Sequence, residues 1–253
     1  MSALILLVWS SSSLAQEPAP DPVPSPSEQS VSADVGDEVE PLSPLWWCEE
    51  GLPTTGDVCL LGFQMVEVPG GTFTAGVAVG PMSAFKANRK RAELLHRSVW
   101  MTETEITQGQ FTSLMGINPS ETCAKVVDQN RPVSCVSWND AIAFANALSA
   151  VTNLSPAYQM VNGHWKWDRE SDGYRLPTSM EWERAARGQR ATRFAGADNP
   201  RAVAWFRDNA SDAPQPVAGR MPNDFGLYDM SGNVWEWVWD GVPSGIIPSK
   251  SKE

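Results

Sequence analysis

The sequence predicts an α+β domain built from short helices, short strands and long irregular connections. Three stretches have the apolar spacing of amphipathic helices, and several shorter ones alternate between apolar and polar residues as β-strands do. These patterns do not follow one another as repeating βαβ units, and no internal repeat is visible. An α+β architecture is therefore favoured over a parallel α/β sheet.

The first strands are expected just after residue 60. Met65–Val68 alternates and then runs into Pro69-Gly70-Gly71, which predicts a tight turn and a hairpin. Thr72–Gly76 is the expected return strand of that hairpin. Gly80–Glu93 shows no clear period and is expected to form a loop.

Two further strand regions follow. Arg97–Glu103 places Val99 and Met101 on one face. Gln159–Trp167 alternates around Asn162-Gly163, a dipeptide that favours the tight turn of a β-hairpin. We therefore expect one short strand before the first helix and one hairpin between the second and third helices.

The three helices carry start signals. Thr107 precedes a helix over residues 108–115, which Gly116 ends. Ser137 followed by Asp140, and Thr178 followed by Glu181, have the spacing of a capping box, in which the hydroxyl satisfies a free amide at the helix start. The helices are therefore expected to begin at these residues.

The N-terminus has features of an export signal. Ala3–Trp9 is a short apolar run, and Ser13-Leu14-Ala15 ends it with the small residues of a cleavage site. The run is too short to span a bilayer. Residues 1–15 are therefore interpreted as a signal peptide, which predicts a secreted or periplasmic protein without a membrane span. The alternative is a merely apolar, disordered N-terminus.

Residues 16–45 are rich in Pro, Ser, Glu and Asp and contain little aliphatic mass, which predicts a disordered linker. The first fifty residues hold nine acidic residues and no Lys or Arg, so about −9 of the net charge of −11 belongs to this tail. No cluster of basic residues with interleaved aromatic residues occurs. Nucleic acid is therefore not an expected partner.

Four cysteines, Cys48, Cys59, Cys123 and Cys135, suggest two disulfides in an exported chain. Three pairings are possible, and the two local loops, Cys48–Cys59 and Cys123–Cys135, are the most economical. A metal site is the competing interpretation, but the sequence lacks a Cys-x-x-Cys motif and neither histidine is near a cysteine.

The tryptophans are expected mainly to fill the core, because large aromatic side chains gain most from burial. A platform for carbohydrate or peptide is the alternative. The residues concerned are Trp138, Trp182, Trp205, Trp235 and Trp237.

Five ordered blocks resemble the formylglycine-generating enzyme, or sulfatase-modifying factor, family. The blocks are Met65–Phe73, Glu103–Phe111, Pro132–Ala141, Tyr174–Gly188 and Pro222–Trp237. The resemblance implies a variant of the C-type-lectin-like fold with little regular secondary structure, here over residues 46–240 and without the family's C-terminal strands. Residues 241–253 are then expected to be an unstructured tail.

The last block has the chemistry of a cation site. Asp229 and Glu236 are hard oxygen donors, and Gly232 permits a backbone turn that can direct carbonyl groups inward. By its resemblance to the family, the block implies structural calcium bound by the Asp229 and Glu236 side chains and by the Gly232 and Val234 carbonyls. Alternatively, the two acids cap turns or pair with an arginine such as Arg175 or Arg184. The family's second calcium site falls near residues 204–214, where no ligands can be assigned.

The resemblance implies an oxidase that converts a sulfatase cysteine to formylglycine with copper and oxygen. Copper(I) prefers thiolates, which the family supplies from a Cys pair after the Trp-Glu-Trp segment. No Cys follows Cys135 here, so no catalytic residue can be assigned and copper is not supported. We expect a non-catalytic binding or structural module with an unidentified protein or peptide partner. The alternative is a fragment of a longer formylglycine-generating oxidoreductase.

Overall fold

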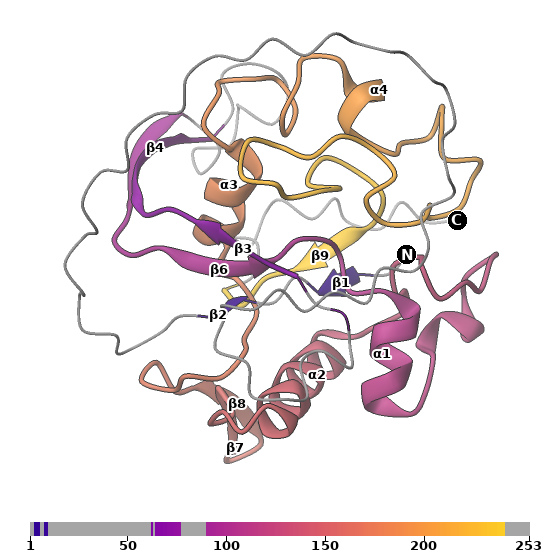
Figure 1. Ribbon diagram of the computed structural model, residues 1–253. Helices are drawn as coiled ribbons and strands as arrows, with labels where there is room; N and C mark the ends of the chain where they lie inside the picture. The colour runs from indigo at the N-terminus through magenta and orange to yellow at the C-terminus, as the bar shows by residue number, and fades with distance from the viewer. Residues whose placement is uncertain (1–2, 6–7, 10–61, 63, 77–89, 241–253) are drawn as a thin grey trace, which may run out of the picture.

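A computed structural model describes residues 3–5, 8–9, 62, 64–76 and 90–240 (Figure 1). The expected linker, the Cys48–Cys59 pair and the expected tail at 241–253 lie outside the described residues. The strands are β1 (Ala3–Ile5), β2 (Val8–Trp9), β3 (Met65–Val68), β4 (Gly71–Ala75), β5 (Arg91–Leu95), β6 (Val99–Thr102), β7 (Tyr158–Val161), β8 (His164–Trp167) and β9 (Trp235–Trp237). The helices are α1 (Gln108–Met115), the 3₁₀ helix η4 (Pro119–Thr122), α2 (Trp138–Val151), α3 (Ser179–Arg187) and α4 (Pro200–Val203).

Strands β3 and β4 follow one another along the chain and are paired with β6 and β5, which run antiparallel to them. β3 pairs with β6, with Val68 opposite Val99, and β4 pairs with β5, with Gly71 opposite Leu95. The predicted β3–β4 hairpin is therefore wrong. The chain continues through Gly70, whose amide donates to the Ser98 hydroxyl at 3.3 Å, instead of reversing.

The expected loop over Gly80–Glu93 also needs correction at its end, because β5 begins at Arg91. Its residues show the burial pattern of a partly exposed strand without a strict alternation, which explains why no strand was expected there. Two more strands complete the small sheets: β2 pairs antiparallel with the other edge of β6, and β1 pairs parallel with β9. Both come from the segment interpreted as a signal peptide.

All three main helices begin as expected. The side chains of the N-cap residues Thr107, Ser137 and Thr178 each accept a hydrogen bond from the amide three residues later, and the side chain at that position bonds back. A capping interaction of this kind is worth about 1 kcal/mol. The hairpin β7–β8 turns at Asn162-Gly163, both in the left-handed region, as the dipeptide predicted.

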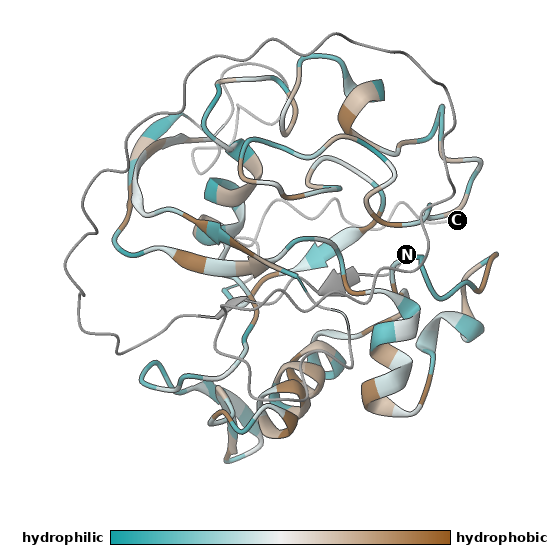
Figure 2. Ribbon diagram, in the orientation of Figure 1, coloured by the Kyte–Doolittle hydropathy of each residue, from teal (hydrophilic) through white to brown (hydrophobic). Residues whose placement is uncertain are grey.

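Two apolar clusters form the core. The larger one gathers the inner faces of α1 and α2, and includes the stacked rings of Phe111 and Phe144, whose centroids lie 5.0 Å apart. The smaller one lies between the β3–β6 ribbon and α3 and includes Val68, Met101 and Leu227. Figure 2 shows the apolar colour on α1 and α2 in bands, as expected of helices that bury one face.

Six of the tryptophans that the structure describes take part in these clusters. Five of them, Trp138, Trp165, Trp167, Trp237 and Trp239, pack against the larger cluster. Trp182 packs against the smaller one. Trp235 differs, because it is 80% exposed.

Cys123 and Cys135 form a disulfide, as predicted for the second local loop, with their Cα atoms 6.4 Å apart. The described part of the chain contains no free cysteine. Among the same residues, no helix is long and apolar enough to cross a bilayer.

A buried ion pair fixes the start of α3. Arg175 donates two hydrogen bonds to Glu181, at 2.8 and 2.7 Å, and the two side chains are only 6% and 9% exposed. Burial by itself would raise the pKa of Glu181, but Arg175 and the Thr178 amide and hydroxyl outweigh it and lower this pKa. Arg175 thus connects the chain before α3 to the capping box of that helix.

Candidate cation-binding site

The four predicted cation ligands lie on one loop, residues 229–236, that leads into β9. The loop turns at Asp229 and Asn233, whose φ angles of 59° and 62° lie in the left-handed region. A hydrogen bond of 3.1 Å from the Gly232 amide to the Asp229 carbonyl closes the first turn. The Asn233 amide donates to the Trp205 carbonyl at 2.9 Å, which attaches the loop to the segment after α4.

Gly232 is needed for a reason other than the expected one. It does not adopt the left-handed conformation, and a Cβ atom there would lie 2.1 Å from the Trp205 carbonyl oxygen. Glycine therefore allows two backbones to approach closely. The Gly232 carbonyl and the Asn233 N–H belong to one trans peptide group and therefore point in opposite directions. Because this N–H donates to the Trp205 carbonyl, the Gly232 carbonyl faces away from Trp205.

Asp229 is almost fully buried, at 2% exposure. Its Oδ2 atom accepts a hydrogen bond from the Ala218 amide at 2.9 Å, whereas its Oδ1 atom is buried and has no hydrogen-bond partner. Burial raises the pKa of Asp229 to about 6, and the single bond from Ala218 opposes this only in part. A buried carboxylate oxygen without a donor is costly, so it is a natural position for a cation.

Glu236 approaches the same region from β9. Its carboxylate accepts a hydrogen bond from the indole N–H of Trp182 on α3. Burial raises the pKa of Glu236 to about 8; the Trp182 bond opposes the rise, and the negative charge of Asp229 adds to it. The two predicted side-chain ligands therefore influence each other electrostatically.

The arginine alternative is not what the structure shows. Arg175 is engaged by Glu181, and Arg184 donates to the carbonyls of Pro69 and Gly188. The turn-capping alternative describes Asp229 only in part, because it accounts for one of its two oxygens.

Sequence reasoning missed a third carboxylate, that of Glu105. This residue lies between β6 and α1 and is fully buried. Its Oε1 accepts from the Val234 amide at 3.2 Å and its Oε2 from the Asn233 side chain at 2.7 Å. Burial raises its pKa well above the usual value, and the charges of Asp229 and Glu236 raise it further.

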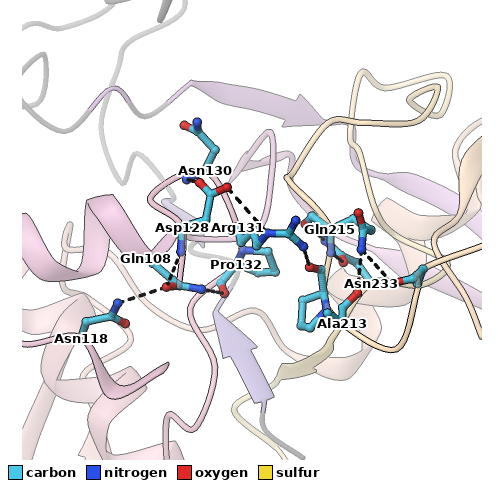
Figure 3. A network of polar contacts seen from close by, with 11 residues as sticks. Gln108, Asn118, Asp128, Asn130, Arg131, Pro132, Ala213, Gln215 and Asn233 are labelled. Atoms are coloured by element: carbon cyan, nitrogen blue, oxygen red, sulfur yellow. Dashed lines mark hydrogen bonds and ion pairs between the residues drawn. The ribbon is translucent and has the colours of Figure 1, made fainter. Parts of the chain in front are cut away.

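Asn233 joins the loop to the rest of the polar interior. Its side-chain oxygen accepts from the Gln215 amide at 2.8 Å, and its nitrogen also donates to the Gln215 carbonyl at 3.1 Å (Figure 3). The neighbouring Pro214 carbonyl accepts a hydrogen bond from Arg131, which pairs with Asp128. The loop is thus held by contacts from segments far apart in the sequence.

These groups suit a hard cation. None of the three carboxylates forms an ion pair with Lys or Arg within the described residues. No three acidic, His or Cys side chains there converge to metal-ligand distance. A cation at this loop would therefore combine Asp229 and Glu236 with backbone carbonyls, an all-oxygen set that calcium accepts. The two described cysteines are joined in a disulfide, so they offer no thiolate of the kind that copper(I) prefers.

The family comparison covers most of the domain. Residues 58–244 match the family model FGE-sulfatase, described as the sulfatase-modifying factor enzyme 1-like domain. The chain is 36% identical over 171 residues to chaperone protein LppX of Paenibacillus barcinonensis, covering 54% of this chain and 60% of LppX. It is 35% identical over 126 residues to the formylglycine-generating enzyme of Thermomonospora curvata, covering 44% of this chain and 34% of that enzyme. The chain thus spans less than two thirds of these relatives.

Solved structures show the same fold. Treponema denticola variable protein 1 is 30% identical with a TM-score of 0.62, and the match covers 70% of this chain and 72% of that one. CarF is 33% identical with a TM-score of 0.56, covering 70% and 80%. The α+β, formylglycine-generating-enzyme-like fold expected from the sequence is therefore confirmed.

Proposed function

Because the chain belongs to the family of sulfatase-modifying factor enzyme 1-like domains, we propose that it is a non-catalytic, exported binding or structural module of that family. The observation that carries this proposal is the state of its thiols. The described cysteines, Cys123 and Cys135, are joined to each other in a disulfide. The described residues therefore offer no thiolate for the copper chemistry of formylglycine generation.

We further propose that the module binds calcium at Asp229 and Glu236, with the carbonyls of Gly232 and Val234. Support comes from the buried, unpartnered Oδ1 of Asp229 and from the absence of a paired Lys or Arg among the described residues. Bound calcium would neutralise two buried carboxylates and hold β9 against the end of the 229–232 turn. Its role in this proposal is structural.

The catalytic question has a direct test. The purified chain, loaded with copper, is expected to leave a peptide with the sulfatase cysteine motif unchanged, and mass spectrometry should find no conversion of the thiol to an aldehyde. An active formylglycine-generating enzyme serves as the positive control. Aldehyde formation by this chain would instead support the alternative, a part of an oxidoreductase like the Thermomonospora curvata enzyme.

Export rests on the apolar run and small residues of positions 1–15. Expressed with its own N-terminus in a bacterial host with a secretory pathway, the chain is expected to leave the cytoplasm and to begin at Gln16. N-terminal sequencing of the exported product checks this. A product that stays in the cytoplasm with residues 3–9 intact, so that β1 and β2 are kept, would show that this segment is a part of the domain.

A further inference from the structure

We propose that Glu105 is the positioning residue of the cation loop: through Asn233 and Val234 it holds the backbone whose carbonyls would bind the cation. This proposal rests on the calcium site proposed above and adds a residue from a distant part of the chain. Glu105 contacts the loop across a sequence separation of 128 residues.

The geometry favours positioning over direct ligation. Both carboxylate oxygens of Glu105 already accept hydrogen bonds, one from the Val234 amide and the other from the Asn233 side chain. Together with the bond from the Asn233 amide to the Trp205 carbonyl, these contacts fix two consecutive peptide groups from two sides. The Gly232 carbonyl belongs to the first of these peptide groups, and the Val234 carbonyl follows the second.

The charge distribution explains why an acid is used here. Glu105 is fully buried and has no Lys or Arg partner within the described residues, so its negative charge is compensated only by two neutral donors. On the same loop, Asp229 keeps one buried oxygen without a donor. A hard divalent cation at the loop would favour the charged forms of these carboxyl groups without being bonded to Glu105.

The site provides its own spectroscopic reporter. Trp182 donates its indole N–H to Glu236, so a terbium ion in the calcium position would lie close to an indole ring. Excitation of tryptophan should then sensitise terbium emission, and calcium should quench it by competition. Trp182→Phe should lower the emission while the calcium affinity stays measurable by calorimetry.

The test compares full-length wild type with Glu105→Gln, which keeps the size of the side chain but removes its charge. Terbium binding and calcium competition are expected to weaken by about 10–100-fold, the usual effect of losing a group that orients metal ligands. Glu103→Gln is the matched control, because this acid is two residues away and half-buried, and it should bind as wild type does. Circular dichroism confirms that the variants are folded.

A second variant guards against a folding failure at position 105. Asn233→Gly keeps the left-handed backbone accessible and removes the amide side chain, which contacts both Glu105 and the Gln215 backbone. It should weaken binding similarly, and the double variant should lose less than the sum of the two single losses. Wild-type affinity in a folded Glu105→Gln protein would overturn the positioning role alone. A wild-type chain without terbium or calcium binding would overturn the calcium site and this role with it.

Discussion

Calcium is expected to raise the melting temperature of the chain, and Asp229→Ala is expected to abolish the rise. At a hundredfold excess over the dissociation constant, binding to the folded state alone contributes about 2.7 kcal/mol. For a domain of this size that corresponds to roughly 5–10 °C. The effect depends on Asp229 because its buried Oδ1 has no other partner. Differential scanning calorimetry with calcium and with a chelator measures it.

Asp168→Ala is the matched control. It removes the same group from the turn after β8, outside both segments in which calcium ligands are expected, and the exposed Asp168 side chain accepts a local hydrogen bond from the Glu170 amide. This variant should keep the full calcium response. A calcium-dependent rise of equal size in Asp229→Ala would show that the cation binds elsewhere.

Arg175→Met is expected to destabilise the domain by about 3–5 kcal/mol, the usual cost of leaving one member of a buried ion pair without its partner. Glu181 would remain buried and would lose two hydrogen bonds, although it would keep its bond to the Thr178 amide. Urea unfolding followed by tryptophan fluorescence gives the change in the free energy of unfolding. Lys125→Met, which breaks an exposed pair, should cost less than about 1 kcal/mol.

The difference in the free energy of unfolding between Arg175→Met and wild type should depend on pH in a predictable direction. In wild type the pKa of Glu181 is lowered, so this pair stabilises the fold above the pKa of an unfolded glutamate and less as the pH falls through the folded value. Without Arg175 the burial of Glu181 dominates and raises its pKa, so the variant loses stability as the pH rises. The gap should therefore be largest near neutral pH and shrink in acid. A gap that is constant with pH would show that Arg175 acts by packing on Trp167 instead.

Local signals in the sequence were sufficient for elements whose ends are set by their own side chains. Thr107, Ser137 and Thr178 each cap a helix through the residue three positions later, and Asn162-Gly163 turns its own hairpin. These contacts lie within a few residues, so their spacing is visible in the chain itself. The Cys123–Cys135 pairing was open to the same reasoning, because the loop that it closes is short.

Pairing between distant strands was not visible in this way. The turn residues at 69–71 suggested a hairpin, yet β3 pairs with β6 and β4 pairs with β5. These pairings depend on the side chains of β5 and β6, which lie outside the turn. β5 was missed since its partly exposed residues carry little periodicity.

In the cation loop, too, the local residues could be predicted and the distant one could not. Asp229, Gly232, Val234 and Glu236 could be proposed from one continuous segment. Glu105 could not, because nothing in its own neighbourhood requires a partner near residue 233. The only local hint is an acid between the buried residues Met101 and Ile106, where a charge is costly unless something distant satisfies it.

The contacts between Glu105 and the loop before β9 have a consequence for synthesis of the protein. They join the segment before α1 to residues 233 and 234, so they can form only after residue 234 has left the ribosome. Long-range pairings of this kind slow folding, because loop closure costs entropy before any contact is gained. During translation the α1–α2 cluster can form early, whereas β9 and the loop before it must be added last. A nascent chain stalled before residue 229 would therefore leave Glu105 and the Trp182 indole of α3 without their partners in this loop, a surface that chaperones can bind.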